Sequence, residues 1–286
     1  MLKIFGRFIK FGIVIFVVIS GLLGYFSGLV DPEHFQILNL LIFLLGLALF
    51  SGGSLALNQV QEAELDQKMP RTRKRPLPSG ELSLRAALLI SMSMLGLGTL
   101  FLFYVNLVVV SLGIATVVLY NFFYTRYWKL RWPLAAIPGA IPGAVPVLMG
   151  YAAHGTLLSL ASLYLFLIMF LWQIPHFWIL AIRYQKDYEA AGIPVLPAVV
   201  GVPRTLKHIA IYTAALVLLA FASPLFISSG WAYRILVLPM ALWIAWECLG
   251  YYRRGGQGKW LQFFIVLNTG MLVFLLAPVV DRWVVW

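Results

Sequence analysis

Nine apolar segments, each about 20 residues long, constrain the fold of this chain more than any other feature. A helix that crosses the roughly 30 Å hydrocarbon core of a bilayer needs about 20 mostly apolar residues. The chain has 286 residues, of which 62% are hydrophobic and 11% are charged, whereas soluble domains are about 25% charged. We therefore predict an all-α integral membrane protein, in which nine transmembrane helices form one bundle and one domain over residues 1–286. The predicted spans are residues 11–30, 35–57, 84–104, 106–124, 134–153, 159–182, 208–228, 231–249 and 261–280.

The amino-terminal segment has the basic start and apolar run of a signal peptide. Its apolar run is about 20 residues long and is followed by no A-x-A-like site, so we interpret it as an uncleaved first span. The single cysteine, Cys248, excludes an intramolecular disulfide and a cysteine-based metal site.

Positive charge is distributed unevenly among the predicted connections. Nineteen of the 21 lysine and arginine residues fall on one side of the predicted membrane, and only Arg234 and Arg282 fall on the other. Since basic loops stay on the cytoplasmic side, we predict that the amino terminus lies inside and the carboxyl terminus outside. The same asymmetry explains the net charge of +11 without a nucleic-acid partner. The expected location is the inner (cytoplasmic) membrane.

The connection at residues 58–83 carries an unusual concentration of charge. Asn58, Glu62 and Asp66 are spaced i, i+4 and i+8, which places them on one face of a helix that extends past the second span. Two carboxylates and an amide oxygen are the hard ligands that suit Mg²⁺, which commonly completes its shell with substrate phosphates. Arg71 and Arg75 follow and could bind those phosphates. Alternatively, these basic residues are a solvated loop that only sets the topology.

A second loop at residues 183–207 is predicted to open on the same face. It brings Asp187 next to Lys186 and Tyr188, and it could hold a second cation on the other side of a diphosphate. An ordinary polar loop is the alternative. Tyr124 and Lys129 end the fourth span at this face, so that polar groups converge on the inner ends of the second, fourth and sixth spans.

The sixth span contains an ionisable residue within the predicted membrane, His176. It lies about seven residues, or roughly 10 Å, from the inner end of the span, and such residues are functional candidates by default. A hydrogen-bonded packing role is equally compatible with the sequence. Trp172 and neighbouring aromatic rings could stabilise a carbocation, pack on a flat macrocycle, or simply fill space. The fifth span is rich in Gly, Ala and Pro, which permits close helix approach or leaves room for a bulky ligand.

Together these motifs resemble those of the UbiA-type intramembrane prenyltransferases. The stretch "NQVQEAELD", followed by "MPRTRKRPL", is similar to the family's N-x-x-x-[DE]-x-x-x-D motif and its trailing R-T-x-x-R-P-L. The segments "LWQIPHFW" and "KDYEAAGIPVLP" resemble the branch that acts on heme. There are departures: Gln59 replaces a common second Asn, Val147 replaces the second proline of a Pro-Pro pair, and Ala191 replaces the second aspartate of many quinone-type relatives.

The resemblance implies transfer of a farnesyl group from farnesyl diphosphate to a vinyl group of heme B, with addition of water. It implies Mg²⁺ as cofactor and a cytoplasmic-face active site in the lipid bilayer, with heme A synthase or terminal oxidase assembly factors as partner proteins. The implied catalytic residues and metal ligands are Asn58, Glu62, Asp66 and Asp187. The implied substrate-binding residues are Arg71, Arg75, Tyr124, Lys129, Trp172, His176, Lys186 and Tyr188.

Two alternatives remain open at this point. The nearer one is a prenyltransferase that acts on a quinone precursor or another aromatic acceptor. The other is a non-catalytic heme carrier or a transporter, although transporters commonly place ionisable groups near the bilayer centre and here the acids cluster at one surface.

Overall fold

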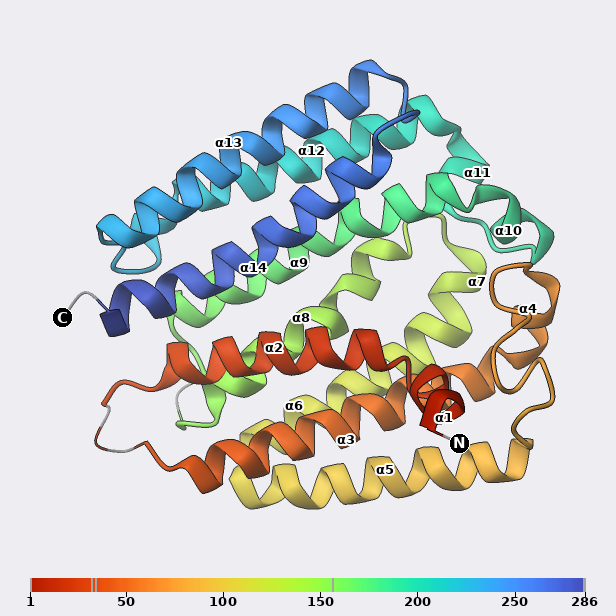
Figure 1. Ribbon diagram of the computed structural model, residues 1–286, viewed down its shortest axis with the longest axis horizontal. Coiled ribbons are helices and arrows are strands. Elements are labelled where there is room, and N and C mark those ends of the chain that lie inside the picture. Colours follow the sequence, from red (N-terminus) through yellow and green to blue (C-terminus); the bar gives the residue numbers. More distant parts are fainter. Residues whose placement is uncertain (1, 32, 34, 156, 285–286) are drawn as a thin grey trace.

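The computed structural model describes residues 2–31, 33, 35–155 and 157–284, which form helices joined by turns and irregular connections, without a strand (Figure 1). The first half contains α1 (Leu2–Phe8), α2 (Phe11–Gly28), α3 (Ile37–Gln61), α4 (Ala63–Lys68), α5 (Leu84–Val105), α6 (Leu107–Val117), the π-helix η2 (Val118–Trp128) and α7 (Lys129–Arg131). The second half contains α8 (Ala136–Ala152), α9 (Leu160–Arg183), α10 (Gln185–Ala190), α11 (Leu196–Val200), α12 (Val202–Phe221), the short 3₁₀-helix η3 (Ser223–Leu225), α13 (Trp231–Arg253) and α14 (Trp260–Val284).

Eight spans in the described part of the chain are long and apolar enough to cross a membrane. They correspond to eight of the nine predicted segments, with α6, η2 and α7 acting together as one span. The remaining segment is α8, an apolar helix of 17 residues, which at 1.5 Å per residue is about 26 Å long. The prediction of an all-helical, multi-pass membrane protein is confirmed.

The boundaries of α12 differ from the prediction of residues 208–228. The helix begins at Val202 and ends at Phe221, because proline at position 203 is tolerated in a first helical turn and the exposed Arg204 and Lys207 extend the helix beyond its apolar part. A segment chosen by hydropathy alone therefore starts too late. At the other end, Ser223–Leu225 forms a separate 3₁₀ turn.

The bundle has two halves joined by α8. Figure 1 shows α2, α3, α5 and α6 on one side and α9, α12, α13 and α14 on the other, with the two termini at opposite ends of the molecule. Close approach between α2 and α8 depends on glycine, since a Cβ atom at Gly24 would lie 2.0 Å from the Val147 carbonyl oxygen and one at Gly150 would lie 2.0 Å from the Gly21 carbonyl oxygen. The small residues of the fifth predicted span thus permit the close helix packing expected of them.

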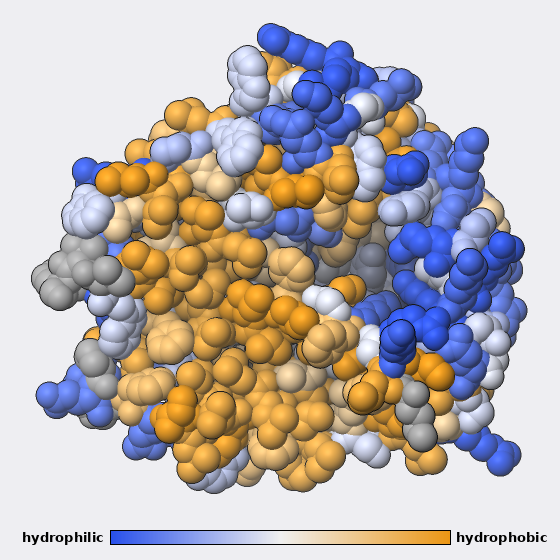
Figure 2. Space-filling model, viewed as in Figure 1, coloured by the Kyte–Doolittle hydropathy of each residue, from blue (hydrophilic) through white to orange (hydrophobic). Residues whose placement is uncertain are grey.

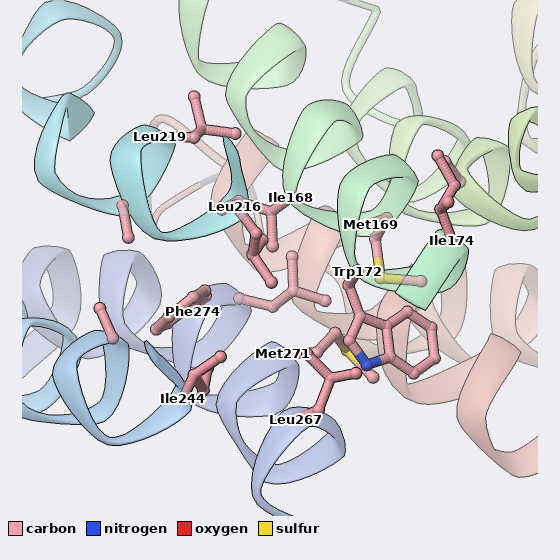
Figure 3. Close-up of a cluster of buried hydrophobic side chains, with 14 of the residues drawn as sticks. Ile168, Met169, Trp172, Ile174, Leu216, Leu219, Ile244, Leu267, Met271 and Phe274 are labelled. Atoms are coloured by element: carbon pink, nitrogen blue, oxygen red, sulfur yellow. The ribbon is translucent and has the colours of Figure 1, made fainter. Parts of the chain in front are cut away.

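Each half has its own apolar core. In the larger core, side chains of α9, α12, α13 and α14 meet, and Ile168, Leu216 and Phe274 are fully buried there (Figure 3). The second core surrounds Phe43 and Leu47 of α3. Because α8 contributes side chains to both cores, it fixes the distance between the two halves.

The surface separates into an apolar region and a polar end. Figure 2 shows hydrophobic residues over most of the visible face and hydrophilic residues gathered at the side where Figure 1 places α4, α10 and α11. Large apolar side chains such as Leu89, Leu100 and Leu218 are about two-thirds exposed, as expected for helices that face lipid. The charged connections therefore lie at one end of an apolar bundle.

Candidate active site

A ladder of polar side chains joins α3 to η2 and α7 at the charged end. Ser54 Oγ donates to Asn121 Oδ1 at 2.6 Å, and Asn58 Nδ2 donates to Thr125 Oγ1 at 3.0 Å. The third rung is Glu62 Oε1, which accepts from the ammonium group of Lys129 at 2.5 Å. All three pairs have the same sequence separation of 67 residues, so the two helices run parallel in a fixed register.

The π-helix lies on the other side of this ladder. The Thr125 hydroxyl donates to the carbonyl oxygen of Tyr120, five residues earlier, at 2.8 Å, and π-helical turns occur frequently at functional sites. Asn121 Nδ2 donates to the Ser54 carbonyl oxygen at 3.0 Å and to Gln61 Oε1 at 3.2 Å. These bonds satisfy the buried amide and hold η2 against α3.

A third element, the turn between α1 and α2, completes the first part of the site. Lys10 has a left-handed backbone (φ 53°), and its Nζ donates to Asn58 Oδ1 at 2.6 Å. The turn is held in place by Gln59, whose amide donates to the carbonyl oxygens of Arg7 and Phe8 at 2.7 and 2.6 Å. Burial lowers the pKa of Lys10 to about 7, and the positive charge of Arg75 contributes in the same direction.

Glu62 is 4% exposed. Burial alone would raise its pKa, but the ammonium groups of Lys129 and Lys10, together with a hydrogen bond from Asn58, outweigh burial and hold the pKa of this carboxyl below its ordinary value. Glu62 is therefore a carboxylate at neutral pH.

Asp66 lies one turn further along and is fully buried. Both of its carboxylate oxygens accept from Arg75 Nη1, at 3.0 and 2.7 Å. The residue before a proline is disfavoured in a helix, so α4 ends at Lys68, two residues before Pro70. The chain then turns back, which brings Arg75 to Asp66. The hydroxyl of Thr72 donates to the Asp66 carbonyl oxygen at 3.0 Å and stabilises the turn.

The second predicted loop packs against the first. Met69 lies in a small apolar cluster with Ala191 and Ile193, and the guanidinium carbon of Arg71 lies 4.8 Å from the ring centroid of Tyr184. The two charged loops are therefore in contact.

The residues of α10 lie less deeply than those of α3. Lys186 is exposed, while Asp187 and Tyr188 are partly buried. In the described part of the chain, no hydrogen bond or ion pair joins Asp187 to Asn58, Glu62 or Asp66, and no three His, Cys, Asp or Glu side chains form a metal-binding group. The structure thus brings Asn58, Glu62, Asp66, Arg75 and Lys129 together and leaves Asp187 at the edge.

Tyr124 lies between the polar ladder of α3 and η2 and the loop that carries α10. Its ring packs directly on Gly139 of α8, where a Cβ atom would lie 2.6 Å from Tyr124 Cε2. It stacks on Tyr120 with ring centroids 5.8 Å apart, and it lies near Lys129 and Tyr188. The glycine on α8 leaves the room that this ring occupies.

His176 lies in an aromatic environment between α9 and α14. Its ring centroid is 4.9 Å from that of Trp172 and 4.7 Å from that of Phe264, and Nδ1 is 3.0 Å from Asn268 Oδ1. Figure 3 shows Trp172 beside Leu267 and Met271 of α14. Both predicted residues therefore face the α9–α14 contact.

Two cavities lie outside this network. One, of about 740 Å³, is bounded by Arg183, Lys207, Trp260 and the glycine-rich turn at residues 255–258. The other, of about 920 Å³, lies toward the carboxyl-terminal end and is bounded by residues that include Ser27 and Asp281.

Several polar residues around the predicted site were not predicted from the sequence. Lys10 and Thr125 hydrogen-bond to Asn58, and Asn268 lies within hydrogen-bond distance of His176. Asn121 bonds to Ser54, one rung below Asn58 in the ladder. The i, i+4, i+8 spacing of Asn121, Thr125 and Lys129 repeats the spacing on α3 and would have indicated the ladder.

The oxygen atoms on this face of α3 and α4 are of the kind that ligate a divalent metal ion. The oxygen atoms of Asn58, Glu62 and Asp66 each accept a hydrogen bond from a basic side chain, so that all three already interact with a cationic group. Two carboxylates and one amide oxygen are ligands that Mg²⁺ prefers. These three residues would hold the ion.

Comparison with known proteins identifies the family. The model of the UbiA prenyltransferase family matches residues 14–270. The chain belongs to this family. It is 48% identical over 284 residues to a protein of Bdellovibrio bacteriovorus named protoheme IX farnesyltransferase, covering 99% of this chain and 97% of the relative. It is 37% identical to a protein of the same name from Leptospira interrogans, covering 81% and 79% of the two chains.

Two solved structures have the same fold. A digeranylgeranylglyceryl phosphate synthase superposes with a TM-score of 0.79 at 20% identity, covering 98% of both chains. A UbiA homologue from Archaeoglobus fulgidus, bound to GPP and Mg²⁺, superposes with a TM-score of 0.67 at 15% identity, covering 96% and 99%. The expected family, prenyltransferase class and membrane-embedded character are confirmed.

Proposed function

We propose that this enzyme transfers the farnesyl group of farnesyl diphosphate to a vinyl group of heme B and adds water, which yields heme O and diphosphate. The observation that carries the proposal is the buried line of Asn58, Glu62 and Asp66, paired with basic side chains at one end of a membrane bundle. The names of the relatives support the choice of heme as the acceptor.

The first step is loss of the diphosphate. Asn58, Glu62 and Asp66 would hold Mg²⁺, and Asp187 at the edge would serve a second ion. A bound Mg²⁺ would withdraw charge from the diphosphate oxygens. Arg75 and Lys129 lie next to the ligands and stabilise the leaving anion as its charge develops.

Other side chains hold the diphosphate from the loops. Arg71 and Lys186 lie on the two inner-face loops, and their positive charges bind the outer phosphate oxygens. The C–O bond to the farnesyl group breaks, and both electrons leave with the diphosphate. Tyr124 and Tyr188 face the allylic cation that remains and exclude water from it.

The second step forms the new carbon–carbon bond. The terminal carbon of a heme vinyl group supplies its π electrons to the farnesyl cation, and the positive charge moves to the vinyl carbon next to the macrocycle. Water adds its oxygen there and releases one proton, which gives a hydroxyethylfarnesyl substituent. Trp172 and His176 would contact the macrocycle from α9.

We also infer the arrangement in the membrane. In this proposal α8 is a ninth, short span, and the whole chain is one domain in the inner (cytoplasmic) membrane. The amino terminus and the charged loops lie on the cytoplasmic side, following the distribution of basic residues. Heme A synthase or terminal oxidase assembly factors would receive the product.

A direct assay tests the proposal. Purified protein is incubated with heme B, farnesyl diphosphate and Mg²⁺, and the extracted heme is analysed by mass spectrometry. We expect a gain of one farnesyl and one hydroxyl group that disappears in excess chelator. Parallel reactions offer a hydroxybenzoate or a naphthoate, and a product from these acids alone would replace heme with an aromatic acceptor.

A further inference from the structure

One hydrogen bond, between His176 and Asn268, determines which ring nitrogen of His176 carries the hydrogen. Asn268 lies two helical turns after Trp260 on α14, and its Oδ1 is 3.0 Å from His176 Nδ1. The amide nitrogen of Asn268 donates to the Phe264 carbonyl oxygen at 2.5 Å. A carbonyl oxygen can only accept, so this contact fixes which end of the amide is nitrogen.

The orientation of the amide assigns the proton on His176. Since Asn268 presents its oxygen, Nδ1 of His176 must donate and therefore carries the hydrogen. The surroundings are apolar and aromatic, and no ion pair of His176 exists among the described residues, so a charged imidazolium would be costly here. The ring is neutral, and Nε2 carries an available lone pair.

The surroundings of the ring leave this lone pair without a protein partner. In the part of the chain that the structure describes, no hydrogen bond reaches Nε2. The rings of Trp172, Phe177 and Phe264 lie with centroids 4.7–5.6 Å from that of the histidine. A basic nitrogen set among flat apolar surfaces suits a ligand that is itself flat and carries a Lewis-acidic centre.

We propose that Asn268 is a positioning residue, which holds His176 in the Nδ1–H tautomer so that Nε2 binds the iron of the heme acceptor. This inference rests on the proposed function. Metal-binding histidines commonly donate their other N–H to a protein acceptor, which fixes the ring and raises the basicity of the ligand. The hydrogen bond from Nδ1 to Asn268 has this arrangement.

The test measures the bond between iron and histidine rather than turnover alone. Protein in detergent is loaded with heme B, reduced, and examined by resonance Raman spectroscopy for the iron–histidine stretching band. We expect the band in the wild type and its loss in His176→Gly. Asn268→Asp offers a stronger acceptor and raises the frequency, whereas Asn268→Leu has no acceptor, lowers the frequency and weakens heme binding by about 10–100-fold.

Controls separate this inference from folding and from the proposed function. Gln262→Leu removes an amide from the same helix, one that donates to Glu247 at 2.8 Å, and leaves the band unchanged. The two opposite shifts at Asn268 distinguish positioning from general damage. If the protein farnesylates heme but both Asn268 variants keep the wild-type frequency, the inference is wrong and the function stands. If the wild type binds no heme, both are wrong.

Discussion

Asp66→Asn separates the structural role of the Asp66–Arg75 pair from its catalytic role. The substitution keeps the shape of the side chain and removes its charge, which leaves Arg75 without a counter-ion. Removing one partner of a buried ion pair costs roughly 3–5 kcal/mol. The side chains here are 1% and 22% exposed, so water compensates part of the loss for Arg75, and we expect a destabilisation of about 2 kcal/mol. Turnover should fall on the order of 10²-fold or more, because the site loses one of the two carboxylates proposed to hold Mg²⁺.

The double variant Asp66→Asn/Arg75→Met provides the decisive comparison. It removes the unpaired guanidinium, so thermal unfolding in detergent should return most of the way to the wild-type Tm. Turnover, measured as farnesylated heme by mass spectrometry, should stay low, and raising the Mg²⁺ concentration should recover only part of it in the single variant. Full turnover in Asp66→Asn, or turnover that returns together with stability in the double variant, would show that Asp66 only holds the turn.

Three further substitutions probe the surroundings of the site. Gly139→Ala places a Cβ atom 2.6 Å from the ring of Tyr124, and we expect overpacking to cost about 1–3 kcal/mol, visible as a lower Tm together with slower turnover. Thr125→Val removes the acceptor of the Asn58 amide. The lost hydrogen bond costs about 1 kcal/mol of folding stability, and the variant should need a higher Mg²⁺ concentration for half-maximal activity. Tyr184→Leu removes the ring beneath the guanidinium group of Arg71; the lost cation–π interaction is worth about 0.5–1 kcal/mol, and its absence should raise KM for farnesyl diphosphate severalfold at unchanged kcat.

Each of these substitutions has a matched control. Gly96→Ala adds a methyl group where no atom lies within 4 Å and should not lower the Tm. Thr116→Val removes a hydroxyl that donates to the Leu112 carbonyl oxygen of its own helix and should leave the Mg²⁺ dependence unchanged. Tyr184→Phe keeps the ring and should keep the wild-type KM. An equal effect of a substitution and its control would contradict the specific contact proposed for it.

The positions of the spans and of the first motif were predictable because they depend on local pattern. Helical periodicity placed Asn58, Glu62 and Asp66 on one face, and the structure buries all three. Lys10 was not predictable as their partner, because a basic residue at a helix start has the same sequence appearance whether it sets topology or enters the site. Asn268 accepts from His176 across 92 residues of sequence, and only the packing of α14 on α9 brings the two residues together.

The charges of the network explain why so many basic side chains accompany two acids at the edge of a membrane. Lys10, Arg75 and Lys129 supply three positive charges when protonated, and Glu62 and Asp66 supply two negative ones, so the group carries an excess of one positive charge. A magnesium ion with a fully ionised prenyl diphosphate carries two positive and three negative charges, a net of minus one. The charges of these five side chains, one magnesium ion and the diphosphate then sum to zero, which matters because an uncompensated charge is costly where water is scarce. Without substrate, the basic side chains compensate the carboxylates; with it, they compensate the phosphates. A site with carboxylates alone would bind the metal ion and leave the departing diphosphate without a cation to stabilise it.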